Sequence, residues 1–157
     1  MHEFLITAMI GCLLIVVCGI TVYEMLRLVW IWLPRMRSHP RMRIFMVIIC
    51  IFGVHIINIW IYGLVYYLLI EYFGLGTMIG TAIERGEYAL DFFGCLYFSA
   101  VTYSTVGFGD ITPEGALRML AGVEALSGFI FIGWTVSFTY LAMEKFWALP
   151  HRKKDPE

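Results

Sequence analysis

Charged side chains are scarce in this chain of 157 residues, where Asp, Glu, Lys and Arg together make up only 15%. Soluble globular domains carry about 25% charged and about 45–50% apolar residues. Here 61% of the residues are hydrophobic, and a chain of this length cannot bury so much apolar surface in one aqueous core. The composition therefore excludes an ordinary soluble domain and predicts an integral membrane protein.

Cysteine is also sparse, and no two cysteines form a CxxC pair or lie near a set of histidines. We therefore predict buried small side chains, with neither a disulfide framework nor a metal site. No nucleophile–base pair is apparent, so the sequence predicts neither an enzyme nor a cofactor. No helix carries Arg or Lys at every third position, which argues against a voltage sensor. The four cysteines are Cys12, Cys18, Cys50 and Cys95.

Three apolar stretches exceed the length of about 20 residues that a membrane-spanning helix needs. They occupy residues 1–34, 44–73 and 114–147. A fourth apolar stretch, residues 88–103, is too short to cross the membrane and lies between the second and third. The pattern predicts an all-α membrane protein with three transmembrane helices and one short re-entrant helix.

The positive charges gather at two places, the loop at residues 35–43 and the tail at residues 148–157. Three crossings put this loop and this tail on the same side of the membrane. Because cytoplasmic loops are enriched in Lys and Arg, we predict a multi-pass protein of the plasma membrane. Its N-terminus would lie outside, and its basic loop and C-terminus would lie in the cytoplasm.

The segment Thr105-Val106-Gly107-Phe108-Gly109 follows the short apolar stretch directly. Glycine adopts positive φ at little cost, so two alternating glycines would allow successive carbonyls to face one side. Irregular backbone at membrane depth is tolerated only where it is buried in protein or lines a watery path. A row of carbonyls that binds a cation meets this condition, and the negative end of the preceding helix favours a cation nearby.

Residues 105–110 resemble the filter signature of the tetrameric potassium-channel superfamily, T-V-G-Y-G or T-V-G-F-G followed by Asp. The flanks Y-F-S-x-V-T-x-x-T and D-I-T-P are similar too. The resemblance implies a pore domain over residues 44–147, with residues 1–34 as an extra N-terminal helix. Within it, residues 44–73 would be the outer helix, residues 88–103 the pore helix and residues 114–147 the inner helix.

In that superfamily, carbonyl oxygens of the filter replace the hydration shell of the ion. The resemblance therefore implies passive, potassium-selective conduction, with K⁺ as the permeant ion and four identical subunits around the pore. A non-selective cation channel, a subunit of a transporter and a non-conducting membrane adaptor are the alternatives. The K⁺ ligands would come from Thr105, including its hydroxyl, Val106, Gly107, Phe108 and Gly109.

The resemblance also implies supports for this filter. Asp110 stands where members of the superfamily tie the filter mouth to the pore helix, and Tyr97 stands at the place of the aromatic partner. We predict a hydrogen bond from the Tyr97 hydroxyl to Asp110, and the alternative is a solvated Asp110 with Tyr97 as a packing residue. Val101 occupies a position that some members fill with Glu, which puts the resistance of the filter to inactivation in question.

Two residues of the last apolar stretch have more than one interpretation. Gly128 is either a gating hinge or a site of close helix–helix contact. Glu124 is an intramembrane carboxyl group, which should face a cavity or a partner. It would either line the pore cavity or bond a hydroxyl of the pore helix, such as that of Ser99 or Thr102, and we favour the second.

Two residues of the second apolar stretch, His55 and Asn58, share one helical face because they lie three positions apart. We predict that they form interhelical hydrogen bonds, and a haem ligand or proton relay is the alternative. Three acidic residues near the predicted outer mouth would concentrate cations there. They are Glu71, Glu84 and Glu87.

Overall fold

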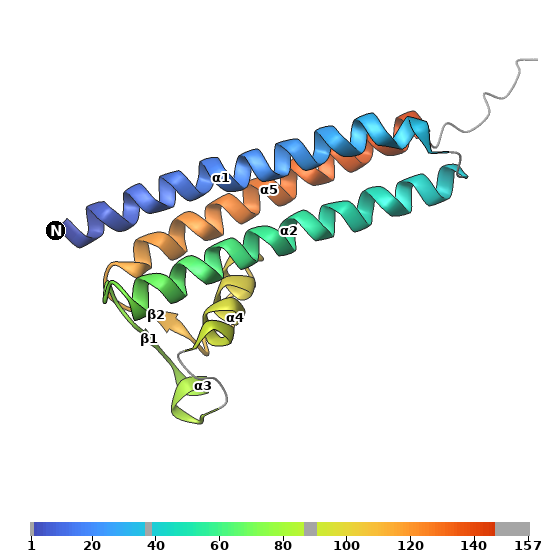
Figure 1. Cartoon of the computed structure of the whole chain (residues 1–157). Helices are drawn as coiled ribbons and strands as arrows, with labels where there is room; N and C mark the ends of the chain where they lie inside the picture. Colours follow the sequence, from blue (N-terminus) through green and yellow to red (C-terminus); the bar gives the residue numbers. More distant parts are fainter. Residues whose placement is uncertain (1, 37–38, 87–90, 147–157) are drawn as a thin grey trace, which may run out of the picture.

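The computed structural model describes residues 2–36, 39–86 and 91–146 of the chain. Three long helices lie side by side, and a shorter helix and a small two-stranded sheet gather at one end of them (Figure 1). In chain order the elements are α1 (His2–Trp32), the 3₁₀ helix η1 (Leu33–Arg35), α2 (Pro40–Glu71), β1 (Met78–Ile79), α3 (Thr81–Glu84), α4 (Phe92–Tyr103), β2 (Thr112–Pro113) and α5 (Leu117–Phe146).

The helices α1, α2 and α5 are each long and apolar enough to cross a membrane. The chain runs in one direction along α1 and α5 and in the opposite direction along α2 (Figure 1). The start of α1, the end of α2 and the start of α5 therefore share one end of the molecule. The protein is thus a membrane protein with three spanning helices, and the loop between α1 and α2 lies at the end away from α4.

Helix α1 packs along α5 and α2 through one buried stripe, whose residues recur every three or four positions as on one helical face. A Cβ added at Gly11 would lie 3.2 Å from the Cγ1 atom of Val123, and one at Gly19 would lie 3.6 Å from the ring of Phe131. Both contacts are with α5. The stripe consists of Thr7, Gly11, Leu14, Cys18, Val22, Leu26 and Val29.

From the sequence alone, the small residues Ala8, Cys12 and Gly19 predict a strip of α1 that packs on α2. The structure corrects this prediction. In the structure Cys12 is exposed and Gly19 faces α5. The contact is set by the neighbouring Thr7–Gly11–Cys18 face, because residues seven apart return to the same side of a helix.

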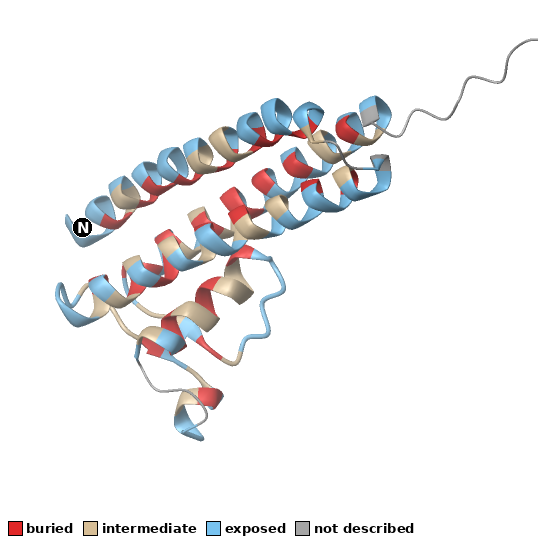
Figure 2. Cartoon of the chain, turned by 45° about the vertical axis from the view of Figure 1, so that its right-hand side comes forward, coloured by how far each residue is buried: buried red, intermediate tan, exposed pale blue. Residues whose placement is uncertain are grey.

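Helix α4 packs against α2 and α5, and both views place it on the opposite side of that pair from α1 (Figures 1 and 2). Its first turn is capped by Asp91, whose Oδ1 accepts a hydrogen bond of 2.9 Å from the Gly94 amide. A Cβ at Gly63 of α2 would lie 3.0 Å from the Leu96 Cα, so the two backbones approach closely. The part of the predicted short helix at residues 88–90 lies outside the described residues.

The connection after α2 forms a feature that the sequence did not indicate. Its strand β1 pairs antiparallel with β2, which follows residue 109, so that Met78 faces Pro113 and Ile79 faces Thr112. The Glu114 amide also donates to the Thr77 carbonyl at 2.8 Å. The segment that leaves residues 105–109 is therefore fastened to the connection between α2 and α4.

The helix boundaries differ modestly from those that the apolar runs predict. Helix α2 begins at Pro40 rather than at residue 44, because proline fits the first turn of a helix, where its missing N–H is not needed. Helix α5 begins at Leu117 rather than at residue 114. The preceding residues, Thr112 and Pro113, form β2. The predicted tail at residues 148–157 and the basic residue Arg37 lie outside the described residues.

Candidate functional site

The segment from Ser104 to Gly109 leaves the C-terminal end of α4 as an extended loop. All six residues are exposed in the single chain, and Figure 2 shows this loop in pale blue. The side chains of Val106 and Phe108 are 56% and 70% exposed. The loop therefore presents a surface that the single chain does not cover.

The amides of this loop point back toward α4. The Thr105 amide donates to the Thr102 carbonyl at 3.0 Å, and the Val106 and Gly107 amides donate to the Val101 carbonyl at 3.1 and 3.4 Å. The described residues contain no cis peptide bond, and in a trans peptide the N–H and the C=O point in opposite directions. The carbonyls of Ser104, Thr105 and Val106 therefore all point away from α4.

The sign of φ alternates along the same loop. Thr105, Gly107 and Gly109 have φ values of 60°, 57° and 78°, whereas Val106 and Phe108 have negative φ. In an ordinary extended strand successive residues turn to opposite faces. Because residues with positive and negative φ alternate in this loop, successive carbonyls can instead gather on one side.

Thr105 is the one non-glycine residue with positive φ in the part of the chain that the structure describes. A non-glycine residue held in this region costs about 1–3 kcal/mol and persists where the surroundings enforce it. Here the amides on both sides of the residue, its own and that of Val106, are bonded to α4. The end of α4 thus imposes a strained conformation on the first residue of the alternating segment.

Asp110 ties the far end of this loop to α4. Its Oδ2 accepts a hydrogen bond of 2.6 Å from the Tyr97 hydroxyl, and its Oδ1 accepts one of 3.0 Å from the Ile111 amide. The predicted Tyr97–Asp110 hydrogen bond is therefore confirmed as a contact. Val101, which lacks a carboxyl group, contributes only its backbone carbonyl here.

Glu124 lies fully buried in α5, between α2 and α4. Its Oε1 accepts a hydrogen bond of 2.5 Å from the Ser99 hydroxyl, and its Oε2 accepts one of 2.8 Å from the Tyr66 hydroxyl. The predicted bond to Ser99 is present, and this position favours the placement behind α4 over a position lining a cavity. Tyr66 was missed by the sequence interpretation.

His55 and Asn58 form a second buried polar cluster. The His55 Nδ1 lies 3.0 Å from the Tyr103 hydroxyl, and its Nε2 lies 3.0 Å from the Thr135 hydroxyl. The Asn58 amide nitrogen donates to the same Tyr103 oxygen at 3.2 Å. The predicted interhelical hydrogen bonds are confirmed, and they join α2 to the end of α4 and to α5.

One face of α2 carries both clusters. His55, Asn58, Tyr62 and Tyr66 follow at spacings of three, four and four residues, and the Tyr62 hydroxyl lies 3.0 Å from the Ser127 hydroxyl. Residues at these spacings lie above one another on a helix. The repeat is visible in the sequence and could have identified Tyr62 and Tyr66 as partners of the other helices.

Gly128 faces the last residue of α4. A Cβ at this position would overlap the Tyr103 carbonyl oxygen, whereas a Cβ at Gly133 would have open space around it. Close helix–helix contact therefore accounts for Gly128 in this structure, and its role as a hinge stays a prediction. Of the three acidic residues predicted near the outer mouth, Glu71 and Glu84 are exposed, while Glu87 lies outside the described residues.

These elements define a membrane protein in which two long helices hold a short helix and a loop of aligned carbonyls. A family model described as "Ion channel" matches residues 54–145, which is more than half of the chain. The chain therefore belongs to this family of two-transmembrane pore-loop ion channels, and the predicted family is confirmed. The matched part includes most of α2, all of α4 and most of α5, whereas α1 lies outside it.

Two relatives of the chain are called Protein LctB, one from Bacillus caldotenax and one from Geobacillus stearothermophilus. Each is 51% identical over 35 residues, which make up 22% of this chain and 26% of the relative. The chain thus matches about a quarter of the length of these curated relatives. No solved structure matches the chain.

Proposed function

We propose that this protein is one subunit of a homotetrameric channel that conducts K⁺ passively and selectively across the plasma membrane. The observation that carries the proposal is the common direction of the Ser104, Thr105 and Val106 carbonyls, away from the helix to which their neighbouring amides are bonded. The filter would comprise residues 105–109, and α4 would be its pore helix.

The chemistry of a partly dehydrated cation supports this function. Rings of backbone carbonyls replace the water around K⁺ in channels of this kind. The positive φ values at Gly107 and Gly109 extend the alternation beyond Val106, which favours further inward carbonyls at Gly107 and Phe108. The C-terminal end of α4 carries partial negative charge, and it directly precedes the first ligand, Thr105.

A single chain cannot surround a cation, which supports assembly of several chains around one pore. A single loop provides one row of oxygens, whereas a cation needs ligands on all sides. The loop is also exposed in the single chain, and such backbone is stable at membrane depth only when it is covered or lines a watery path. Identical chains related by a rotation axis would supply the missing rows, and the resemblance to the tetrameric potassium-channel superfamily favours four of them.

The orientation belongs to the same proposal. The filter, β1 and β2 would lie at the outer surface, together with the start of α1. The basic loop at residues 35–43 and the C-terminus would lie in the cytoplasm, as the excess of arginine in that loop favours.

Ion flux into liposomes tests the proposal. Purified protein should carry K⁺ and exclude Na⁺, and Gly107→Ala should abolish K⁺ flux because alanine at a φ of 57° is strained. Gly53→Ala is the matched control, since it makes the same change in α2 at a position with open space around it. Equal K⁺ and Na⁺ flux would indicate a non-selective channel, and no flux of either ion would leave the adaptor alternative.

A further inference from the structure

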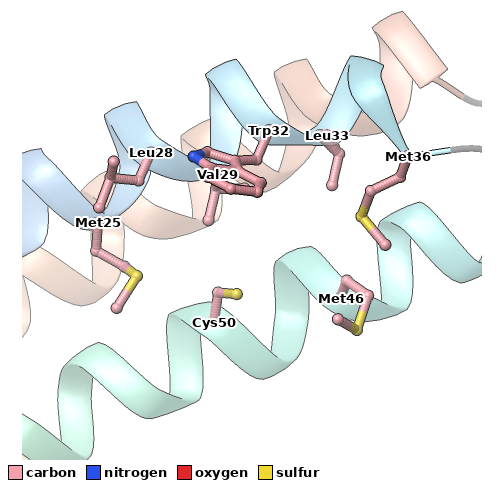
Figure 3. A pocket seen from close by; sticks show the side chains of 8 residues that line it. All are labelled: Met25, Leu28, Val29, Trp32, Leu33, Met36, Met46 and Cys50. Carbon is pink, nitrogen blue, oxygen red and sulfur yellow. The ribbon is translucent and has the colours of Figure 1, made fainter.

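A cavity of about 260 Å³ lies between α1 and α2, near the end of the molecule that carries the basic loop. Figure 3 shows side chains of α1 and η1, among them Met25, Val29 and Leu33, facing Met46 and Cys50 of α2. All of these side chains are apolar or contain sulfur. The cavity can therefore hold a hydrocarbon group and offers nothing to a polar one.

The basic end of this cavity carries an arginine with unused donors. The Arg43 Nη2 donates a hydrogen bond of 2.7 Å to the carbonyl of Met36, which itself lines the cavity. A guanidinium group has five N–H donors, and the buried Arg43 Nε has no partner among the described residues. The side chain is thus held at the end of the cavity with its charge uncompensated by any acidic group in the described contacts.

Further positive charge lies close to Arg43 in the sequence. Arg35 and Arg41 are exposed on either side of the loop, and residues 35–43 contain no acidic residue. Trp32, which also lines the cavity, belongs to the residue types that gather at membrane–water interfaces. The cavity therefore opens within the hydrocarbon region, and the arginines lie at the level of the lipid headgroups.

We propose that this cavity binds one anionic phospholipid of the leaflet that meets the basic loop. An acyl chain would fill the space between α1 and α2, and the phosphate would accept hydrogen bonds from the guanidinium group of Arg43. Arginine binds phosphate through a planar fork of donors, and basic pockets between transmembrane helices bind anionic headgroups. Arg35 and Arg41 add attraction to the headgroup.

The pairing of an apolar cavity with uncompensated arginines decides the occupant. A neutral lipid or the apolar helix of a second copy would fill the cavity but would leave the charge of Arg43 without a counterion. An anionic phospholipid satisfies both parts of the site at once. It would also fasten α1, which lies outside the matched ion-channel region, to α2.

Native mass spectrometry of the purified, delipidated protein tests this site without any ion flux, so its outcome is independent of the proposed conduction. The protein is titrated with phosphatidylglycerol and with phosphatidylcholine of identical acyl chains. The wild type should bind phosphatidylglycerol more tightly, and Arg43→Gln should weaken that binding by about fivefold, the contribution of one arginine near an anionic headgroup.

Three further variants separate the parts of the site. Arg43→Lys should show a headgroup preference between those of the wild type and Arg43→Gln, because it keeps the charge but loses the planar fork of donors. Cys50→Trp should weaken binding of both lipids, because the indole fills the cavity. Arg118→Gln is the matched control: Arg118 also donates to a backbone carbonyl, that of Pro113 at 3.1 Å, but at the other end of the protein.

The proposal is overturned by equal binding of the two lipids to the wild type, or by equal losses in Arg43→Gln and Arg118→Gln. A Cys50→Trp protein that binds lipid normally but loses its oligomeric state would assign the cavity to a second copy instead.

Discussion

The Ser99 hydroxyl of α4 donates a hydrogen bond of 2.5 Å to the Glu124 carboxyl group of α5. The same hydroxyl lies 2.9 Å from the Ile59 carbonyl of α2, and the second oxygen of Glu124 accepts from Tyr66. One buried carboxyl group of α5 therefore accepts hydrogen bonds from α2 and from α4, the short helix that precedes residues 105–109. The position of that helix depends on polar contacts as well as on packing.

Replacement of Glu124 by leucine should destabilise the protein strongly. It leaves the buried Tyr66 hydroxyl without its acceptor, at a cost of about 1–3 kcal/mol, and leaves the Ser99 hydroxyl with the Ile59 carbonyl alone. Glu124→Gln should cost less, because an amide can accept from one hydroxyl and donate to the other. Thermal unfolding of the purified variants measures their order of stability, with Glu71→Leu as a control at an exposed position. If Glu124→Leu unfolds at the same temperature as Glu71→Leu, the carboxyl group does not hold α4.

The Tyr97–Asp110 hydrogen bond should stabilise the conducting form of the loop. Tyr97→Phe removes the donor from a contact of 2.6 Å to a carboxylate oxygen, and hydrogen bonds to charged groups contribute about 1.5–3 kcal/mol. We expect currents that decline faster during sustained activity. Tyr72→Phe, at a tyrosine that is 71% exposed, should behave like the wild type. An unchanged time course in Tyr97→Phe would mean that this bond does not support the filter.

Substitution at Gly128 separates packing from hinge motion. Gly128→Ala places a Cβ against the Tyr103 carbonyl, and such overpacking costs about 1–3 kcal/mol. Gly133→Ala has open space and should preserve or raise stability, since alanine favours helices over glycine. Thermal unfolding distinguishes the two accounts, because a pure hinge at Gly128 predicts altered opening with no loss of stability in Gly128→Ala.

The contact between Gly80 and the loop exit should matter for conduction. Gly80 has a φ of 152°, and a Cβ there would overlap the Asp110 carbonyl. Gly80→Ala should therefore displace Asp110 and reduce K⁺ flux relative to Na⁺ flux. Gly86→Ala serves as the control, since Gly86 also has positive φ but no neighbour within 4 Å. Wild-type selectivity in Gly80→Ala would show that the strand pair β1–β2 does not position the filter exit.

Much of this architecture can be predicted from the sequence because its signals are local. Lipid demands long apolar helices, so the three spans follow directly from hydropathy. The Tyr97–Asp110 and Glu124–Ser99 contacts could be predicted because the family resemblance fixes the register of the loop, and because a buried carboxyl group requires a partner.

Other features depend on contacts between distant segments and leave little local signal. The two-residue strands β1 and β2 are too short to show a period, and only their pairing across the loop defines them. The buried stripe of α1 differs from the predicted strip because α1 carries apolar residues on every side, so periodicity does not mark its buried face. The cavity beside Arg43 could not be predicted from the sequence, because its lining combines residues of α1 and η1 with residues of α2.

The reversal potential of the purified protein in a planar bilayer, with K⁺ on one side and Na⁺ on the other, tests the central claim most directly. Carbonyls gathered around a dehydrated ion predict a reversal potential that follows the K⁺ gradient and shifts when K⁺ is varied alone. A potential near zero, unmoved when K⁺ replaces Na⁺, would contradict the account.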